Sequence, residues 1–284
     1  MQIAVDGKHK LIVASEVVND GNDTGQLHAM ACASQAALGV ATLTVIADSG
    51  YFNGETLRRC EADGIEPFVP EPERSRHSTA ERFGLDAFSY DAEADEYGCP
   101  HGRRLRPMPG LKCDVVGKLR RRYSSARSDC KACPLRLRCL SPKGDRRVIE
   151  RWEHEPVVER HRLRMADEGE QGGAAMMQRR KALAEHPFGT LKCRAGYRHF
   201  LVRGFTKVRG EWGLMALCYN LTRALNILGL KRLIEVLCQL SSHFEWPISP
   251  LKTPTKRLWA RLAAEQSSFR QNPSRSPNQI YAAA

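Results

Sequence analysis

The chain has 284 residues, enough for one large domain or two modest ones with a sizeable buried core. Its hydrophobic fraction of 42% is ordinary for a globular protein, and no apolar run approaches the roughly 18 residues of a transmembrane helix. The start lacks a basic segment followed by a long apolar run, so we expect a cytoplasmic protein without a signal peptide. The ten cysteines are then reduced thiols or metal ligands.

The net charge of +12 is concentrated in one segment. Residues 101–148 hold 15 Lys and Arg against three Asp, and the remaining sequence balances at 29 basic and 29 acidic residues. A polyanion is the expected partner of such a block. DNA or RNA is favoured over a membrane surface because the block lacks an amphipathic apolar face.

The first 70 residues predict alternating strands and helices. Strands are expected at 2–5, 10–14, 42–47 and 65–70, and helices at 25–38 and 53–62. Asp6-Gly7 is the hairpin turn between the first two strands, and Thr24 or Asp23 caps the first helix. The third strand is nearly all apolar, as expected of a strand covered on both faces. This alternation predicts an α/β sheet.

The character of the sequence changes at Glu71. A polar, acidic stretch precedes the basic block, and apolar periodicity resumes near Val148. Helices are expected at 157–184, interrupted by the glycine pair Gly172-Gly173, and at 210–228. Proline, serine, glutamine and asparagine then predict a disordered tail.

Two carboxylates are candidates for a site that binds metal and phosphate. Asp48 ends the third strand, where open α/β sheets place ligands, although a turn aspartate bonded to its own backbone is the alternative. Glu185 lies in a basic setting with Lys192 two helical turns on, although half of a surface ion pair is the alternative. Pro187 is expected to break or kink the helix just past this acid. Together the two acids suit metal-assisted phosphoryl transfer.

Four sequence blocks resemble bacterial insertion-sequence transposases of the DDE class. The blocks are V-D-G-K-H-K-L-I-V (5–13), A-D-S-G-Y-F-N (47–53), A-E-H-P-F-G-T-L-K (184–192) and R-G-E-W-G-L-M-A-L-C-Y-N-L (209–221). The similar subgroup has a cysteine-containing insertion between its second and third catalytic acids. The resemblance implies an α/β, RNase H-like mixed sheet flanked by helices. In that fold three carboxylates bind two Mg²⁺ or Mn²⁺ ions and cleave and transfer DNA strands at transposon ends.

The resemblance also assigns roles to residues of this chain. Asp48 matches the second acid and Glu185 the third, both as catalytic metal ligands. Lys192 matches a signature lysine expected to contact transposon-end DNA. The tyrosine and arginine of that signature are replaced by Gln178 and Lys181, so metal binding is better supported than DNA-end handling. The residues expected to contact DNA are Lys192, Lys181, Arg180, Arg120, Arg121 and Arg122.

The first acid of the family has no match in this chain. The family carries it on the first strand of the sheet, and the strands expected at 2–5 and 10–14 match the second and third. Asp6 is a weaker substitute because it belongs to the hairpin turn. We therefore expect a truncated core that is inactive alone or is complemented by an N-terminal transposase fragment. A non-enzymatic DNA-binding module and a pseudogene product are the alternatives, and a homo-oligomer on DNA is left open.

The basic block contains a candidate zinc site. The sequences C-P-H-G and C-K-A-C-P-L-R-L-R-C supply one C-x₂-C pair and two further thiols, the set that a tetrahedral Cys₄ site requires. The four residues are Cys99, Cys130, Cys133 and Cys139. His101 could replace Cys99, and Cys113 is a spare. The alternative is a set of reduced cysteines that pack a small insertion, whereas zinc would produce a metal-folded, DNA-contacting knob.

The expected organisation has four parts. They are 1–90, the N-terminal part of the truncated RNase H-like core; 91–148, the basic cysteine-containing insertion; 149–235, the C-terminal helical part of the core; and 236–284, a disordered tail. Trp212 is expected in the core rather than as a base-stacking platform, because it leads an apolar helix. Glu211 is a weaker alternative for the third acid.

Overall fold

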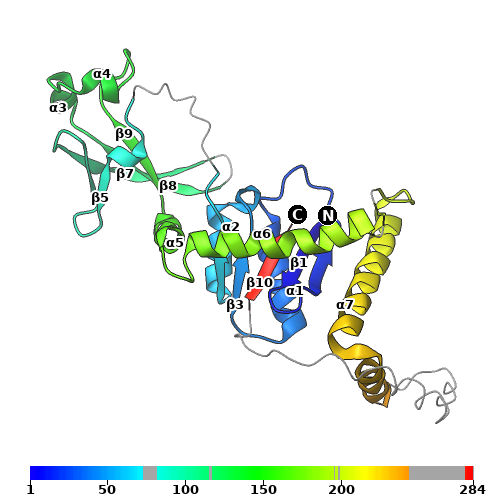
Figure 1. The fold of residues 1–284 in the computed structure, drawn as a ribbon. Helices are drawn as coiled ribbons and strands as arrows, with labels where there is room; N and C mark the ends of the chain where they lie inside the picture. Colours follow the sequence, from blue (N-terminus) through cyan, green and yellow to red (C-terminus); the bar gives the residue numbers. More distant parts are fainter. Residues whose placement is uncertain (73–81, 115–116, 195, 198, 243–278, 284) are drawn as a thin grey trace, which may run out of the picture. The chain divides into compact units, whose positions relative to one another are not determined.

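The computed structural model describes residues 1–72, 82–114, 117–194, 196–197, 199–242 and 279–283. The chain forms two compact units (Figure 1). The core unit comprises Met1–Pro70 and Met165–Ala284, and the inserted unit comprises Glu71–Arg164. The inserted unit is wider than the insertion delimited at 91–148, because strands on both sides of that segment join its sheet.

The core unit is built on a five-stranded mixed sheet of order β2-β1-β10-β3-β4. Its strands are β1 (Gln2–Asp6), β2 (Ile12–Glu16), β3 (Leu43–Ile46), β4 (Ile65–Phe68) and β10 (Gln279–Ala283). β1 pairs antiparallel with β2 and β10, while β10 pairs parallel with β3 and β3 with β4. The first four strands confirm the expected ones. β10 was not expected, and it lies between β1 and β3 (Figure 1).

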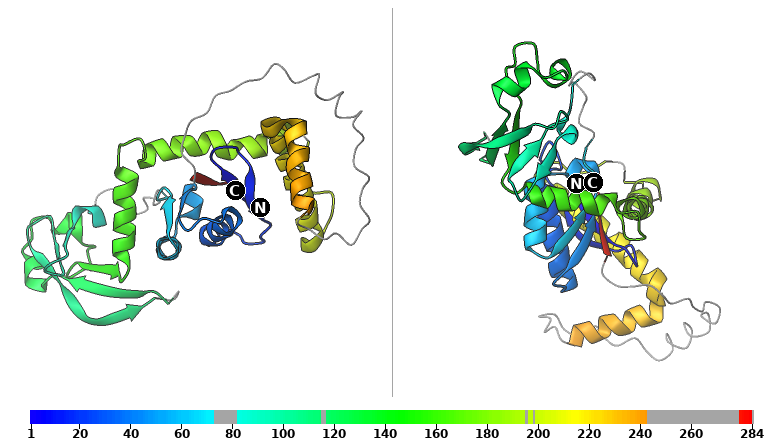
Figure 2. Two further views of the ribbon diagram at one scale, coloured as in Figure 1. Left: turned by 90° about the horizontal axis from the view of Figure 1, so that it is seen from below. Right: turned by 90° about the vertical axis from the view of Figure 1, so that its left-hand side faces the viewer.

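Helices cover both faces of this sheet (Figure 2). The helices are α1 (Gln26–Leu38), α2 (Gly54–Ala62), α6 (Gly173–Gly189) and α7 (Phe205–Ser242). On the α6 side, Met176 and Leu183 pack against Ile46. Trp212 of α7 is buried in a second cluster with Ile3, as expected of a core residue. The flanked mixed sheet confirms the α/β class and is compatible with an RNase H-like fold.

The start of α1 differs from the expectation. Its N-cap is Gly25, with no side-chain capping bond, so Thr24 and Asp23 are not caps. The Asp23 carboxylate instead accepts a hydrogen bond from Gln2 Nε2 at 2.5 Å. A tertiary partner has therefore taken the acceptor that would have capped the helix.

The turn between β1 and β2 is longer than a two-residue hairpin. Asp6 N donates to Leu11 O at 2.8 Å, and the left-handed residue of the loop is Lys10 (φ 59°). The Asp6 carboxylate accepts the backbone N–H groups of Lys8 and His9 at 3.2 and 2.5 Å. Asp6 is thus a turn residue whose carboxylate is engaged by its own loop.

Pro187 does not end α6. The helix continues through it to Gly189, and a π-helical segment, η3 (Thr190–Arg194), follows. The helix therefore does not break at His186, where a break or a kink was expected. Proline removes one hydrogen bond of the helix, and here the change of helical geometry comes three residues later as a widened turn.

α7 consists of two helical segments joined by a kink at Gly229, whose dihedral angles are non-helical (φ 75°, ψ 160°). The first begins at Phe205 and ends at this kink, in agreement with the helix end expected at 228, and the second, which was not expected, continues to Ser242. The tail expected from residue 236 onward therefore contains the end of α7 and the strand β10. Residues 243–278 of that tail lie outside the described part of the chain.

The inserted unit holds a five-stranded antiparallel sheet of order β5-β6-β7-β8-β9. Its elements are β5 (Ser89–Asp91), β6 (Glu96–Gly98), β7 (Arg104–Cys113), β8 (Leu119–Ser124), β9 (Val148–Trp152) and the helices α3 (Arg127–Lys131), α4 (Arg136–Cys139) and α5 (Glu155–Ala166). Its core consists of Phe88, Tyr97, Leu105, Tyr123 and Ile149. No strand was expected here, because most side chains of β7 are exposed and hide the alternation.

Candidate functional site

Asp48 lies directly after β3 and caps the short 3₁₀ turn η1 (Ser49–Tyr51). Its Oδ1 accepts Gly50 N at 3.0 Å, and its Oδ2 accepts Arg180 Nη2 at 2.8 Å. The side chain of Asp48 is 41% exposed and that of Arg180 is 21% exposed. Asp48 is therefore both a turn aspartate and one member of an ion pair at the carboxyl edge of the sheet.

The surroundings of Asp48 are buried and polar. Tyr51, three residues on, is 1% exposed and donates its hydroxyl to Gln2 Oε1. Burial raises the pKa of Tyr51, and the charges of Asp23 and Asp48 raise it further. Within the described residues, Arg180 Nε is buried without a hydrogen-bond partner. A cation and a carboxylate therefore meet beside a neutral tyrosine.

Glu185 is not brought to Asp48. The side of α6 that packs on the sheet carries Met176, Arg180 and Leu183, whereas Glu185 is exposed. Five residues separate Arg180 from Glu185, which corresponds to about 140° around an α-helix and about 7.5 Å along it. With Arg180 directed at Asp48, Glu185 therefore points to a different side of the helix.

The other residues expected near the third acid lie as follows. Lys181 and Lys192 are exposed, and Lys192 Nζ lies 5.1 Å from the centroid of the Phe188 ring. Lys192 belongs to η3, so the α-helical spacing assumed between it and Glu185 does not hold. Glu211 accepts the backbone N–H groups of Leu201 and Val202 at 2.9 to 3.1 Å, so its carboxylate stabilises a loop.

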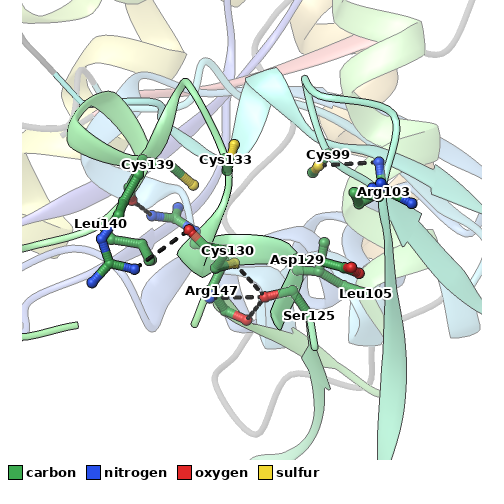
Figure 3. A pocket seen from close by; sticks show the side chains of 11 residues that line it. Cys99, Arg103, Leu105, Ser125, Asp129, Cys130, Cys133, Cys139, Leu140 and Arg147 are labelled. Carbon is green, nitrogen blue, oxygen red and sulfur yellow. Dashed lines mark hydrogen bonds between the residues drawn. The ribbon is translucent and has the colours of Figure 1, made fainter. Parts of the chain in front are cut away.

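The four cysteines of the basic block line one small cavity of about 30 Å³ (Figure 3). Cys99 follows β6, Cys130 belongs to α3, Cys133 lies in the turn after it, and Cys139 ends α4. Arg103 N lies 3.3 Å from Cys99 Sγ as a donor. Elements distant in sequence therefore bring all four thiols to one place. His101 and Cys113 do not line this cavity, and both are exposed.

Four thiols around one cavity are a donor set that a soft metal ion such as Zn²⁺ can use. Burial raises the pKa of the Cys139 thiol, Arg147 lowers it, and the other three cysteines raise it again. In the described part of the chain, no three of these sulfurs lie within 4.8 Å of one another. A tetrahedral zinc ion bound by four thiolates requires sulfur–sulfur distances of about 3.8 Å, so binding would draw the ligands together.

Two of the three β8 arginines expected to contact DNA are paired inside the inserted unit. Arg120 Nε lies 3.2 Å from Asp114 Oδ2, and Arg121 Nη1 lies 2.7 Å from Asp95 Oδ2. Arg122 is half-exposed, and Glu150 lies opposite it on β9. The basic block is therefore partly neutralised by its own aspartates, which the count of charges could not indicate.

Residues 98–225 match a family described as "Transposase DDE domain". The matched range includes Glu185, Lys192 and the four cysteines, and it excludes Asp48. No significant match was found among curated proteins or solved structures. Across the described residues, no helix combines the length and apolar character needed to cross a membrane.

Proposed function

We propose that this chain, which carries a transposase DDE domain over residues 98–225, acts in DNA transposition by strand cleavage and transfer at insertion-sequence ends. DNA is the substrate of this class, and its chemistry uses divalent metal ions. Asp48 and Glu185 are the proposed second and third acids, with Mg²⁺ or Mn²⁺ as the ion. The observation that carries the proposal is the family match over residues 98–225, which includes Glu185, and Asp48 lies where β3 of the α/β sheet ends.

Asp48 and Glu185 do not fit one shared ion in the arrangement described. A guanidinium group holds the carboxylate that a metal ion would need, and Glu185 is exposed on another side of α6. We propose that the chain by itself is inactive or nearly so, with Arg180 supplying the positive charge beside Asp48.

The proposed cause of inactivity is the lack of a first acid. β10 lies between β1 and β3, and its residues Q-I-Y-A-A contain no carboxylate. Tyr281 pairs with Ile46, and continuing this parallel register by two residues brings Ala283 level with Asp48. A segment bearing the first aspartate would therefore act from this strand position. We propose that an N-terminal transposase fragment supplies it.

We further propose that Cys99, Cys130, Cys133 and Cys139 bind Zn²⁺ and that the inserted unit contacts DNA. Cys99 and Cys139 pack against the core of the unit, so metal binding and folding would be coupled. The proposed contacts are Lys181 and Lys192, which are exposed, together with half-exposed Arg122. Such basic side chains provide affinity for the phosphate backbone without reading a sequence.

The test is nicking of supercoiled plasmid DNA with Mg²⁺ or Mn²⁺. The wild-type chain should show little or no nicking, and Ala283→Asp should gain activity that Asp48→Asn and Glu185→Gln each abolish in that background. Lys207→Gln, a change in α7 away from the proposed acids, is the matched control and should retain the gain. Wild-type nicking that survives both acid substitutions would contradict the assignment.

A non-enzymatic DNA-binding module is the second candidate, favoured by the Asp48–Arg180 pair, in which a guanidinium group occupies one of the two proposed acids. This reading predicts tight, salt-sensitive DNA binding and no nicking in any variant, including Ala283→Asp. Binding titrations at several salt concentrations, run beside the nicking assay, distinguish the two functions.

A further inference from the structure

A separate cluster of metal-ligating side chains joins α1 to the C-terminal end of α2. His28 and Cys32 are four residues apart on α1, so they project from one face of the helix. Asp63 is the C-cap of α2. The donor atoms of the three side chains all lie within 4.8 Å of one another. The proposed catalytic acids and the four-cysteine cavity do not include any of these residues.

The distances between the donor atoms are close to those around a tetrahedral metal ion. His28 Nε2 lies 2.6 Å from Asp63 Oδ2, and Cys32 Sγ lies 3.4 Å from His28 Nε2 and 3.9 Å from Asp63 Oδ2. Zinc bonds to sulfur, nitrogen and oxygen at tetrahedral angles would set these three separations at about 3.4 to 3.6 Å. Only the nitrogen–oxygen pair must open appreciably, by less than about 1 Å.

The supporting backbone is well ordered by hydrogen bonds. Asp63 N donates to Arg59 O and Cys60 O at 3.2 and 3.1 Å, and Gly64 follows in the left-handed region (φ 71°). The side chain of Gln35 donates from α1 to Asp63 O at 3.0 Å. These hydrogen bonds therefore fix the Asp63 backbone relative to α1 and its side chains without a bound ion.

We propose that His28, Cys32 and Asp63 bind one divalent transition-metal ion, with Zn²⁺ the best fit, and that a water molecule completes the coordination. A thiolate and an imidazole select Zn²⁺ or its neighbours over Mg²⁺, which prefers oxygen ligands. The His28 side chain is 12% exposed and that of Asp63 is 52% exposed, so an ion reaches the carboxylate side from solvent. The ion links α1 to the C-terminal end of α2 on one face of the core sheet.

A hydrogen-bonded His28–Asp63 pair without metal is the competing interpretation. It uses the 2.6 Å contact and adds the Cys32 thiol as a weak hydrogen-bonding partner of His28 Nε2 at 3.4 Å and of Asp63 Oδ2 at 3.9 Å. Zinc requires all three side chains, so substitution of Cys32 separates the two interpretations.

The experiment titrates metal-stripped full-length chain with Co²⁺ and follows the thiolate-to-cobalt charge-transfer band and the visible bands of tetrahedral cobalt. Cys32→Ser and His28→Ala should each lose one bound equivalent relative to wild type, or bind it at least tenfold more weakly. Cys218→Ser, which changes an exposed cysteine of α7, should retain the wild-type stoichiometry. Because the comparison counts a difference of one equivalent, metal bound at the four-cysteine cavity does not affect it.

Circular dichroism checks that each variant is folded, and Asp63→Asn serves as the second variant if Cys32→Ser does not fold. Unchanged stoichiometry and affinity in His28→Ala together with either Cys32→Ser or Asp63→Asn would overturn the proposal and leave the hydrogen-bonded pair. Loss of the equivalent in these variants, with Cys218→Ser unchanged, supports it.

Discussion

The two compact units of this chain are stabilised by different interactions. The core unit buries aliphatic side chains such as Leu27, Ile46 and Leu57 at 0% exposure between a mixed sheet and its helices. Among the described residues of the inserted unit, the apolar cluster of five buried residues continues into the four-cysteine cavity through partly buried Cys99 and Cys139. The second unit therefore combines a small, mostly aromatic cluster with a candidate metal site, whereas apolar burial dominates in the first.

Polar contacts of the inserted unit add to this contrast. The Asp95 carboxylate accepts hydrogen bonds from the hydroxyls of Tyr90 and Tyr123 at 2.7 and 2.6 Å and from Arg121 at 2.7 Å. Arg151, 7% exposed, lies over the Tyr90 ring and contacts Glu159. These bonds are directional and depend on protonation, whereas the apolar contacts of the core unit do not.

The largest effect is expected at the four-cysteine cavity, where we propose that zinc binds. Removal of zinc by a strong chelator, or the substitution Cys133→Ser, should unfold the inserted unit, because structural zinc contributes on the order of 10 kcal/mol of apparent binding free energy. Hydrogen exchange should then show loss of amide protection in β7 to β9 while β1 and β3 keep theirs.

The control for this prediction is Cys113→Ser, an exposed cysteine outside the cavity, which should leave protection unchanged. If protection of β7 to β9 survives both chelation and Cys133→Ser, the inserted unit folds by its apolar core alone. The contrast between the units would then disappear.

The same difference explains what could be predicted from sequence. The first four strands of the core unit are short apolar runs bounded by turn residues, so local periodicity was enough to find them. The sheet of the inserted unit was missed because only Leu105 of the ten β7 residues is buried. Its strands depend on pairing between strands, which the local sequence pattern does not show.

The positions of site residues could be predicted only where their spacing in the sequence, or a block similar to a known family, indicated them. The four cysteines were found from their C-x₂-C pair and flanking thiols, and they do line one cavity. The Asp48–Arg180 pair joins residues 132 positions apart, and β10 joins the sheet from the far end of the chain. Such long-range pairings leave no periodic signal, so the sequence alone could not indicate which cation would face Asp48.

An intermediate effect is expected from a cavity in the core unit. Leu57→Ala removes a fully buried side chain of α2 and should lower the free energy of unfolding of this unit by about 2 to 5 kcal/mol. The inserted unit should be little affected. Leu137→Ala, at an 86% exposed position, is the matched control and should change stability by no more than about 0.5 kcal/mol.

Urea unfolding followed by hydrogen exchange measures both units in one experiment. A Leu57→Ala loss below about 1 kcal/mol would mean that α2 is not part of the cooperative core. Equal losses in both units would mean that they unfold together, and the comparison between them would need to be abandoned.

The smallest effect is expected from acid, and it should be larger in the inserted unit than in the core unit. The hydrogen bond from Arg151 holds the pKa of Glu159 below its ordinary value of 4.5, against the opposing effect of burial. Burial would raise the pKa of Asp95, but hydrogen bonds from Tyr123, Tyr90 and Arg121 hold it below 3.8. Both carboxylates are therefore favoured as anions in the folded state.

A depressed folded-state pKa stabilises the protein above the unfolded-state pKa, and this stability is lost as the pH falls through the folded value. The inserted unit should become less stable as the pH falls below about 4.5, while the stability of the core unit changes less.

Glu159→Gln should lower the free energy of unfolding by less than about 1 kcal/mol at neutral pH, because Glu159 is 40% exposed and screened by solvent. The difference in the free energy of unfolding between Glu159→Gln and wild type should vanish at low pH. There, Glu159 of the wild type is protonated in both the folded and the unfolded state. A constant difference from pH 7 to pH 3 would show that Glu159 acts through packing rather than through its charge.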